Sequence, residues 1–313
     1  MDKYIKILII SVMFAAIAVG AIVGNFWETR KEIAGNKSET VELPKKTESE
    51  EIANLPPTVK SEEQKIPQQR DPAIGGTLPK SSVPVEIEKT RALLERIRKF
   101  IEEDARRAAF VCSGNPCRIQ TLIFEEDNTH LDCGGGTLAP AEEQKVGVII
   151  KASGVIIENC VFDGFDTAIE IEGDNAILYK NTIRNNAGNG INIEGQKATV
   201  LDNIIEKNFG IGIFIGGESN EHAIVHNQIK NNGTQGLHIL GAGGITVDNN
   251  TITGNKSEGI WLSGNARDNF IYGNTIQGNG GDCTVFLSKI GQSEPQNNRI
   301  ESNKVDKSII TCK

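Results

Sequence analysis

The chain has 313 residues, which is enough for one large domain with additional segments. Aromatic residues make up 5% and glycine contributes 33 residues, a composition that favours β-structure with many tight turns over a helical bundle. The formal net charge of -8 argues against a nucleic acid partner, because binding to phosphate groups requires clustered Lys and Arg.

Residues 1–27 have the pattern of a membrane anchor. Lys3 and Lys6 precede an apolar run from Ile7 to Trp27, 21 residues without a charge, which is long enough to cross a bilayer as a helix. The lysines predict that the N-terminal end stays in the cytoplasm. A cleaved signal peptide is the alternative, with the small residues "AVGA" at 18–21 as its cleavage site. Both interpretations place the rest of the chain outside the cytoplasm, in the periplasm or at the cell surface.

Two segments of different character follow the apolar run. Residues 28–85 are rich in Lys, Glu, Pro, Ser and Thr without an apolar period, which predicts a disordered stalk. Residues 86–110 predict an amphipathic helix with Glu and Arg on its polar face. Its apolar positions at helical spacing are Ile87, Leu94, Ile97, Ile101, Ala105 and Ala108. We expect this helix to pack against the following domain and not against a membrane.

The rest of the chain, residues 111–313, is built from an internal repeat. An Asn-x-Ile/Val element recurs at steps of 22 to 29 residues, at Asn159, Asn181, Asn203, Asn227, Asn250, Asn274 and Asn303. A second polar column, mostly Asn, lies five residues later, and pairs of apolar residues lie ten and twelve residues later. Each repeat therefore holds three short alternating stretches, which can bury their apolar side chains only by stacking on the next repeat.

This pattern predicts an all-β fold, a parallel β-helix of about 7–8 coils with 22–24-residue repeats. Stacking aligns equal positions of successive coils, so the Ile columns form the core and the Asn columns bond at the turns. Glycine supplies turn dihedral angles that other residues resist. A leucine-rich repeat has a similar length, but it requires Leu and Asn at other offsets and includes helix.

The repeat from Ile119 to Thr311 resembles the right-handed parallel β-helices of the pectate-lyase-like group, and "NTHLDCGGGTL" at 128–138 is similar to the first coil of that group. The resemblance implies a right-handed β-helix. It also implies that the helix at 86–110 caps the open end of the core. The group includes lyases, hydrolases, epimerases and non-enzymatic proteins, so the resemblance indicates a fold and not an activity.

Six cysteines in an exported chain predict disulfides. The repeat register predicts three pairs, which are Cys283 with Cys312, Cys133 with Cys160, and Cys112 with Cys117. The first pair shares one offset from the repeated Asn, and the second pair lies about one coil apart. A zinc site in the loop "CSGNPC" at 112–117 is the alternative for the third pair, although the loop lacks a second pair of close ligands.

One column of the repeat is the candidate binding surface. The residues eleven positions after the repeated Asn are Glu170, Asn192, Phe214, His238 and Trp261, and core residues flank each of them. They should point outward as a ladder with steps of about 5 Å. Aromatic faces in such a row can stack on sugar rings, which predicts substrate binding by a polysaccharide. The alternative is an exposed patch that a loop or the stalk covers.

Acidic residues border this column. Glu258 and Asp282 share one offset and should stack on adjacent coils, where two carboxylates about 5 Å apart suit a retaining glycosidase. Their repulsion should raise one pKa, and with His238 they are the catalytic candidates. Glu172 and Glu194 share another offset from the repeated Asn and are candidate ligands for calcium, the one cofactor that the sequence suggests. The alternative is that these are ordinary acidic residues at turns.

The catalytic motifs of the resembled enzymes are incomplete in this chain. The positions that match the Gly-Asp-Asp-Cys motif of polygalacturonases read "FDTA" at 165–168 and "GGDC" at 280–283, and neither keeps both aspartates. The column contains no Arg of the kind pectate lyases use as a base. The Asp-Pro-His-Asp motif of mannuronan epimerases is absent. The sequence therefore predicts a membrane-anchored protein that engages a polysaccharide, with lyase or hydrolase activity left open. The alternative is a non-catalytic scaffold or adhesion module that uses the β-helix as a rigid spacer.

Overall fold

A computed structural model describes residues 84–103, 108–109, 115–142 and 145–307. The predicted anchor at 1–27 and nearly all of the predicted stalk lie outside these residues. Among the helices that the structure describes, none is long and apolar enough to cross a membrane.

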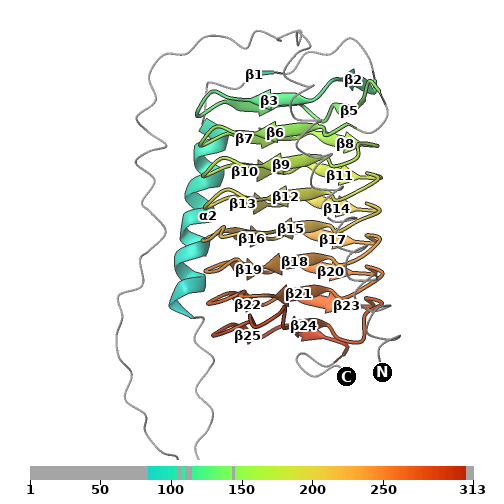
Figure 1. The fold of residues 1–313 in the computed structure, drawn as a ribbon. Helices are drawn as coiled ribbons and strands as arrows, with labels where there is room; N and C mark the ends of the chain where they lie inside the picture. Colours follow the sequence, from blue (N-terminus) through green and yellow to red (C-terminus); the bar gives the residue numbers. More distant parts are fainter. Residues whose placement is uncertain (1–83, 104–107, 110–114, 143–144, 308–313) are drawn as a thin grey trace, which may run out of the picture. The chain divides into compact units, whose positions relative to one another are not determined.

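The strands form three parallel sheets in which each strand pairs with the equivalent strand of the next coil (Figure 1). Sheet A contains β1 (Ala108–Ala109), β4 (His130–Asp132), β7 (Ile156–Glu158), β10 (Ile177–Tyr179), β13 (Thr199–Leu201), β16 (Ala223–Val225), β19 (Thr246–Asp248), β22 (Phe270–Tyr272) and β25 (Arg299–Glu301). Sheet B contains β2 (Cys117–Ile119), β5 (Thr137–Pro140), β8 (Val161–Asp163), β11 (Thr182–Arg184), β14 (Ile204–Glu206), β17 (Gln228–Lys230), β20 (Thr251–Thr253), β23 (Thr275–Gln277) and β26 (Lys304–Val305). Sheet C contains β3 (Leu122–Phe124), β6 (Val148–Ile150), β9 (Ile169–Ile171), β12 (Ile191–Ile193), β15 (Ile213–Ile215), β18 (Leu237–Leu240), β21 (Ile260–Ser263) and β24 (Val285–Ser288).

The apolar columns of the repeat form the core, as predicted. In β8, β11, β14, β17, β20 and β23 of sheet B the middle residue points inward, as Ile183, Ile205 and Ile229 do, and these three residues have no exposed surface. Tight packing between coils also explains the glycine that precedes β6, β12, β15, β18 and β21 of sheet C. A Cβ on Gly212 would lie 2.6 Å from the carbonyl oxygen of Gly236 on the next coil, which is closer than real Cβ contacts allow.

Buried asparagines bond successive coils at two turns, which confirms the predicted columns. Asn232 has no exposed surface, and its Oδ1 accepts hydrogen bonds from the backbone N and the Nδ2 of Asn208 at 3.1 and 3.0 Å. The first predicted repeat is misplaced by one residue, because the backbone N of Cys160 donates to Asn181 Oδ1 at that position. Asn159 instead has a φ of 52°, a left-handed conformation that Asn tolerates better than most residues.

The helix α2 (Val85–Glu103) packs along the outer face of sheet A (Figure 1). Its apolar residues Leu94, Ile97 and Ile101 contact the outward side chains of β7, β10, β13 and β16, and Ile87 contacts β22. The helix therefore runs against the direction in which the coils stack, and its length of about 28 Å matches several coil spacings. Both faces of β7, β10, β13, β16 and β22 are buried as a result.

This position corrects two expectations for the segment 86–110. The helix covers a lateral sheet and not the open end of the core, and Ala108–Ala109 form the strand β1 instead of continuing the helix. The physical reason lies in the outward residues of sheet A. Tyr179, Leu201 and Val225 are apolar on a face that would otherwise meet water, so the apolar stripe of α2 buries them.

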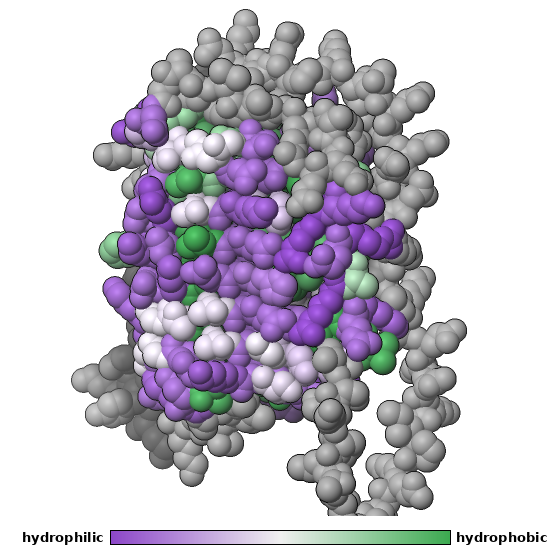
Figure 2. All heavy atoms as spheres, turned by 180° about the vertical axis from the view of Figure 1, so that it is seen from behind, coloured by the Kyte–Doolittle hydropathy of each residue, from purple (hydrophilic) through white to green (hydrophobic). Residues whose placement is uncertain are grey.

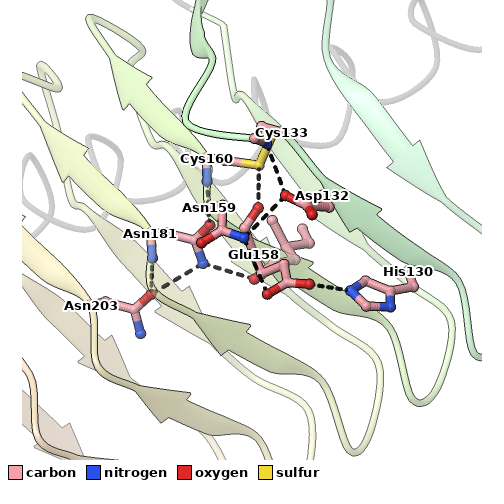
Figure 3. The surroundings of a disulfide bond; sticks show 10 residues. His130, Asp132, Cys133, Glu158, Asn159, Cys160, Asn181 and Asn203 are labelled. Atoms are coloured by element: carbon pink, nitrogen blue, oxygen red, sulfur yellow. Dashed lines mark hydrogen bonds and ion pairs between the residues drawn. A yellow bond between two sulfur atoms is a disulfide. The ribbon is translucent and has the colours of Figure 1, made fainter. Parts of the chain in front are cut away.

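The predicted disulfide between Cys133 and Cys160 is present, with a Cα–Cα distance of 4.8 Å across adjacent coils (Figure 3). Beside it, His130 Nε2 and Glu158 Oε1 lie 2.9 Å apart and are both buried. Cys117 and Cys283 are also disulfide-bonded. Their predicted partners, Cys112 and Cys312, lie outside the described residues, so these two pairings stay predictions.

Candidate functional site

The predicted column lies on the outer face of sheet C, one residue from each strand. Its members, in coil order, are Ile123, Ile149, Glu170, Asn192, Phe214, His238, Trp261 and Phe286. Trp261 illustrates the geometry, since it is half-buried between the fully buried Ile260 and Leu262. Glu170 and Asn192 are half-buried in the same way, and Asn189 Nδ2 donates to Asn192 Oδ1 at 2.9 Å.

Four rings in this column form what we term the aromatic ladder, which is Phe214, His238, Trp261 and Phe286. The His238 and Trp261 rings are stacked with centroids 4.2 Å apart and planes at 7°. The Trp261 and Phe286 centroids are 6.1 Å apart, and Phe214 meets His238 at 66° with centroids 5.4 Å apart. The inner rings therefore cover one another's faces and present their edges outward. This corrects the expectation that open ring faces would point to solvent.

The polar atoms of the ladder form hydrogen bonds with serines on the next strand. Each serine lies two residues after the ladder residue of its own strand. Trp261 Nε1 donates to Ser288 Oγ at 2.7 Å, and His238 Nε2 lies 2.7 Å from Ser263 Oγ. His238 is 7% exposed, and burial lowers its pKa to about 4, while the Glu258 carboxylate acts in the opposite direction. The imidazole is therefore neutral at pH 7, which removes it as a proton donor.

The contact between Ser263 and His238 has the spacing of a nucleophile and its base. Ser263, however, has no exposed surface. A hydroxyl group in that position cannot reach a bond in a bound substrate. The contact thus holds the His238 ring in place within the ladder.

The fourth ring, Phe286, was missed at the sequence level because its coil contains one extra residue. Val285 pairs with Ile260, although it lies eleven residues after its repeated Asn and Ile260 lies ten after its own. The doubled glycine in "GNGGDC" at 278–283 is the signal that could have revealed this insertion. The aromatic residue inside "TVFLS" at 284–288 then falls into the column.

The same insertion falls beside the predicted pair of carboxylates. Asn279 bonds to the backbone N of Asn255 before it, and Val285 pairs with Ile260 after it, so the extra residue lies between these two pairings. Glu258 is half-buried, and its Oε2 accepts hydrogen bonds from Ser257 Oγ and from Gln235 Nε2. Asp282 is exposed. The stacking of Glu258 on Asp282 therefore stays a prediction.

Glu172 and Glu194, the predicted calcium ligands, are exposed at the same position of consecutive coils. Calcium takes six to eight oxygen ligands. Within the part of the chain that the structure describes, no group of three or more His, Cys, Asp or Glu side chains could hold a metal ion. A calcium site at these two carboxylates therefore stays a prediction.

The ladder contrasts with the rest of the described surface. The view from behind shows a mainly hydrophilic surface with small, separate hydrophobic patches (Figure 2). Sheet B illustrates this, because its outward residues include Thr182, Arg184 and Lys230. Phe209, which is 79% exposed at a turn, is the only aromatic among the large exposed hydrophobic residues described. A row of four rings in register is thus a feature of sheet C.

The fold agrees with comparisons to known proteins. Residues 126–276 match the family model described as right handed beta helix region. This segment is a right-handed β-helix. The family match confirms the predicted right-handed β-helix fold. Comparison with the curated proteins gives no match.

Three solved structures illustrate the likeness. The Dettilon tailspike protein aligns with a TM-score of 0.51 and 15% identity, over 71% of this chain and 47% of the tailspike. The periplasmic alginate epimerase AlgG aligns with a TM-score of 0.46 and 13% identity, over 66% of this chain and 67% of AlgG. Pectate lyase Pel9A aligns with a TM-score of 0.38 and 13% identity, over 66% and 68% of the two chains. The chain spans about half the length of the tailspike and 50% of an AlgG double mutant.

Proposed function

We propose that the outer face of sheet C binds a polysaccharide along the aromatic ladder. The observation that carries this proposal is the row of four rings in register, of which Phe214, Trp261 and Phe286 are part-exposed. The ring edges form an apolar ridge along the stacking axis, with one step of about 4.8 Å per coil. That step is comparable to the length of a sugar ring, so successive sugars can contact successive rings.

The polar surroundings give this ridge a way to orient a sugar chain. Ser288, Asn192 and Glu170 are half-buried beside or within the column, and their oxygen atoms can accept hydrogen bonds from hydroxyl groups. Carbohydrate sites combine an apolar surface with a few such polar groups. Two of the similar structures are an alginate epimerase and a pectate lyase, which act on polysaccharides.

The same geometry favours binding over catalysis. His238 is buried with a lowered pKa, and Ser263 is buried. A lyase or hydrolase would therefore have to rely on Glu258 or Asp282 as its acid or base. Anchoring through residues 1–27 and display in the periplasm or at the cell surface belong to the proposal, because a polysaccharide partner lies outside the cytoplasm.

The test measures binding of the full chain to a panel of glycans. We expect Trp261→Ala to abolish most binding, because it removes the largest ring and opens a gap in the ladder. Phe209→Ala is the matched control, since it removes a more exposed aromatic ring at a turn outside sheet C. Equal binding by wild type and Trp261→Ala to every ligand would refute the proposal.

A second variant separates binding from catalysis. Glu258→Gln keeps the size of the side chain but cannot carry a proton. An enzyme would retain binding and stop releasing reducing or unsaturated ends, whereas a binding module would change little. Product analysis by reducing-end assay and absorbance of unsaturated sugars reads out the difference.

A rigid spacer is the second candidate function. The observation that favours it is the pair of buried Asn columns, which bond every coil to the next and stiffen the stack. In that case the ladder serves packing alone, and Trp261→Ala lowers stability without any glycan effect. Absence of binding to the whole panel supports this function.

A further inference from the structure

We infer that the ligand of the sheet C face is a polysaccharide without carboxylate, sulfate or phosphate groups. This inference rests on the proposed function and specifies its ligand class. It concerns the charge of the ligand, which the geometry of the aromatic rings does not determine. Such a ligand differs from alginate and pectate, the anionic polysaccharides after which two similar proteins are named.

The column itself offers nothing that could pair with an anion. Its eight residues contain one carboxylate, Glu170, and no Lys or Arg. The one titratable base in it is His238, whose pKa burial lowers to about 4. An anionic group that contacts the ladder would therefore lose water without gaining an ion pair, which is unfavourable.

The borders of the column add further negative charge. Glu172 and Glu194 occupy consecutive coils in the neighbouring column, and both are exposed. On the other border, the Glu258 carboxylate is close enough to His238 to influence its pKa electrostatically. Glu172 and Glu194 lie beside the coils of Glu170 and Asn192, and Glu258 lies on the coil of Trp261. A uronate or sulfate chain there would meet like charges.

The cations near this face are few and at its ends. Lys151 precedes Glu172 in the neighbouring column, and its Nζ lies 3.9 Å from Glu125 Oε1. Lys289 is exposed beyond the end of β24. The net charge of the whole chain is -8, so its long-range field also repels anions.

A bridging metal ion would be the other way to accept an anionic sugar. Calcium could link protein carboxylates to uronate groups. In the described part of the chain, no group of three or more potential ligands is close enough to hold a metal ion. Among the described residues, the sheet C face therefore has no preformed metal site, and its column has no Lys or Arg to pair with an anionic chain.

The experiment compares matched pairs of oligosaccharides that differ only in charge. Oligogalacturonate and its fully methyl-esterified form are one such pair, and neutral members of the glycan panel with their sulfated forms are others. Binding to the full chain is measured by calorimetry at low and high salt, with chelator and with added calcium. We expect every neutral ligand to bind at least tenfold more tightly than its anionic partner. Salt should narrow the gap, because it screens the repulsion.

Variants locate the effect on this face. The double variant Glu172→Gln with Glu194→Gln should raise the affinity for the anionic member several-fold and leave the neutral member nearly unchanged. Glu88→Gln with Glu95→Gln on α2 is the control, since it removes two charges from exposed sites away from sheet C.

Three results separate the inference about ligand charge from the proposed polysaccharide binding. A neutral preference that the double variant reduces supports the inference. An anionic partner that binds as tightly as its neutral form, or more tightly, overturns the inference but leaves polysaccharide binding intact. Failure of every neutral and anionic glycan to bind contradicts the proposed function, and the inference falls with it.

Discussion

At the scale of single residues, buried asparagine side chains hold successive coils together. Asn208 and Asn232 each donate to the amide oxygen of the next coil, so one side chain serves two coils. A buried polar group without such partners would cost free energy. The columns therefore fix the spacing of the coils as well as satisfying the turns.

We predict that Asn232→Leu lowers the free energy of unfolding by about 1–3 kcal/mol. Leucine cannot accept from Asn208 or donate to Asn255 Oδ1 and the carbonyl oxygen of Ile205. Urea unfolding followed by circular dichroism measures the change. Asn265→Leu at an exposed position is the control. An unchanged midpoint for Asn232→Leu would show that this column is solvated.

Buried histidines should make stability depend on pH. Burial lowers the pKa of His222 from 6.5 to about 4, and His222 is 1% exposed with an unpaired Nε2 in the structure. Because its pKa is lower in the folded state, the unfolded state binds the proton more readily. The stability contribution is complete above pH 6.5 and is lost as the pH falls toward 4, by about 3 kcal/mol at pH 4.

The variant His222→Asn tests this dependence. An asparagine at position 222 can accept from the backbone N of Ala198, as Asn269 accepts from the backbone N of Ile245 at the equivalent turn of a later coil. We expect the loss of stability between pH 6.5 and 4 to become smaller than in the wild type. The readout is the urea midpoint across this pH range. A slope that equals the wild-type slope would show that His222 does not titrate with unfolding.

At the scale of elements, α2 and sheet A depend on each other. The outward residues of sheet A include apolar side chains that α2 covers, and two ion pairs fix the position of the helix. Arg91 lies 3.0 Å from the buried Asp248, and Arg98 lies 3.1 Å from Asp202. These contacts raise the pKa of both guanidinium groups, chiefly through the hydrogen bond to Asp248 for Arg91, so both stay charged.

We predict that Ile97→Ala in this interface destabilises the protein by about 2–4 kcal/mol, because it removes a buried side chain and leaves a cavity. Glu88→Ala on the exposed side of the same helix should change stability by less than about 0.5 kcal/mol. Thermal or urea unfolding compares the two. Equal effects would mean that α2 is not packed on sheet A.

At the scale of the whole molecule, stability comes from stacking along one axis. Each coil contacts only its neighbours, so the terminal coils gain from one side alone. The disulfide Cys133–Cys160 joins early coils, and Cys283 near the last coil is also disulfide-bonded. Covalent links near both ends of the stack therefore stabilise the coils at which fraying would otherwise begin.

We predict that Cys283 pairs with Cys312 and Cys117 with Cys112. Peptide mapping of the oxidised protein under non-reducing conditions identifies the linked peptides. Cys133 with Cys160 provides the internal standard, because the structure contains that bond. Peptides that link Cys283 to any other cysteine would refute the first pairing.

Much of the fold followed from local patterns. The spacing of Asn181, Asn203 and Asn227 and the apolar pairs between them determined the number of strands per coil and which side chains are buried. Such periodicity is readable because every coil repeats the same environment. The pattern failed where the repeat is irregular, at Asn159 and in the coil of Phe286. A single added or missing residue there shifts the register, and short strands do not reveal it.

The sequence by itself determined the β-helix, the inward columns, the outward position of Phe214, His238 and Trp261, and one disulfide pair. Only the tertiary structure decided how the rings meet, that His238 is neutral, and where α2 lies. The physical reason is that periodicity records which way a side chain points from its own strand. Ring orientation, desolvation and the docking of a helix depend on atoms from other coils, whose distances the spacing of residues along one chain does not contain.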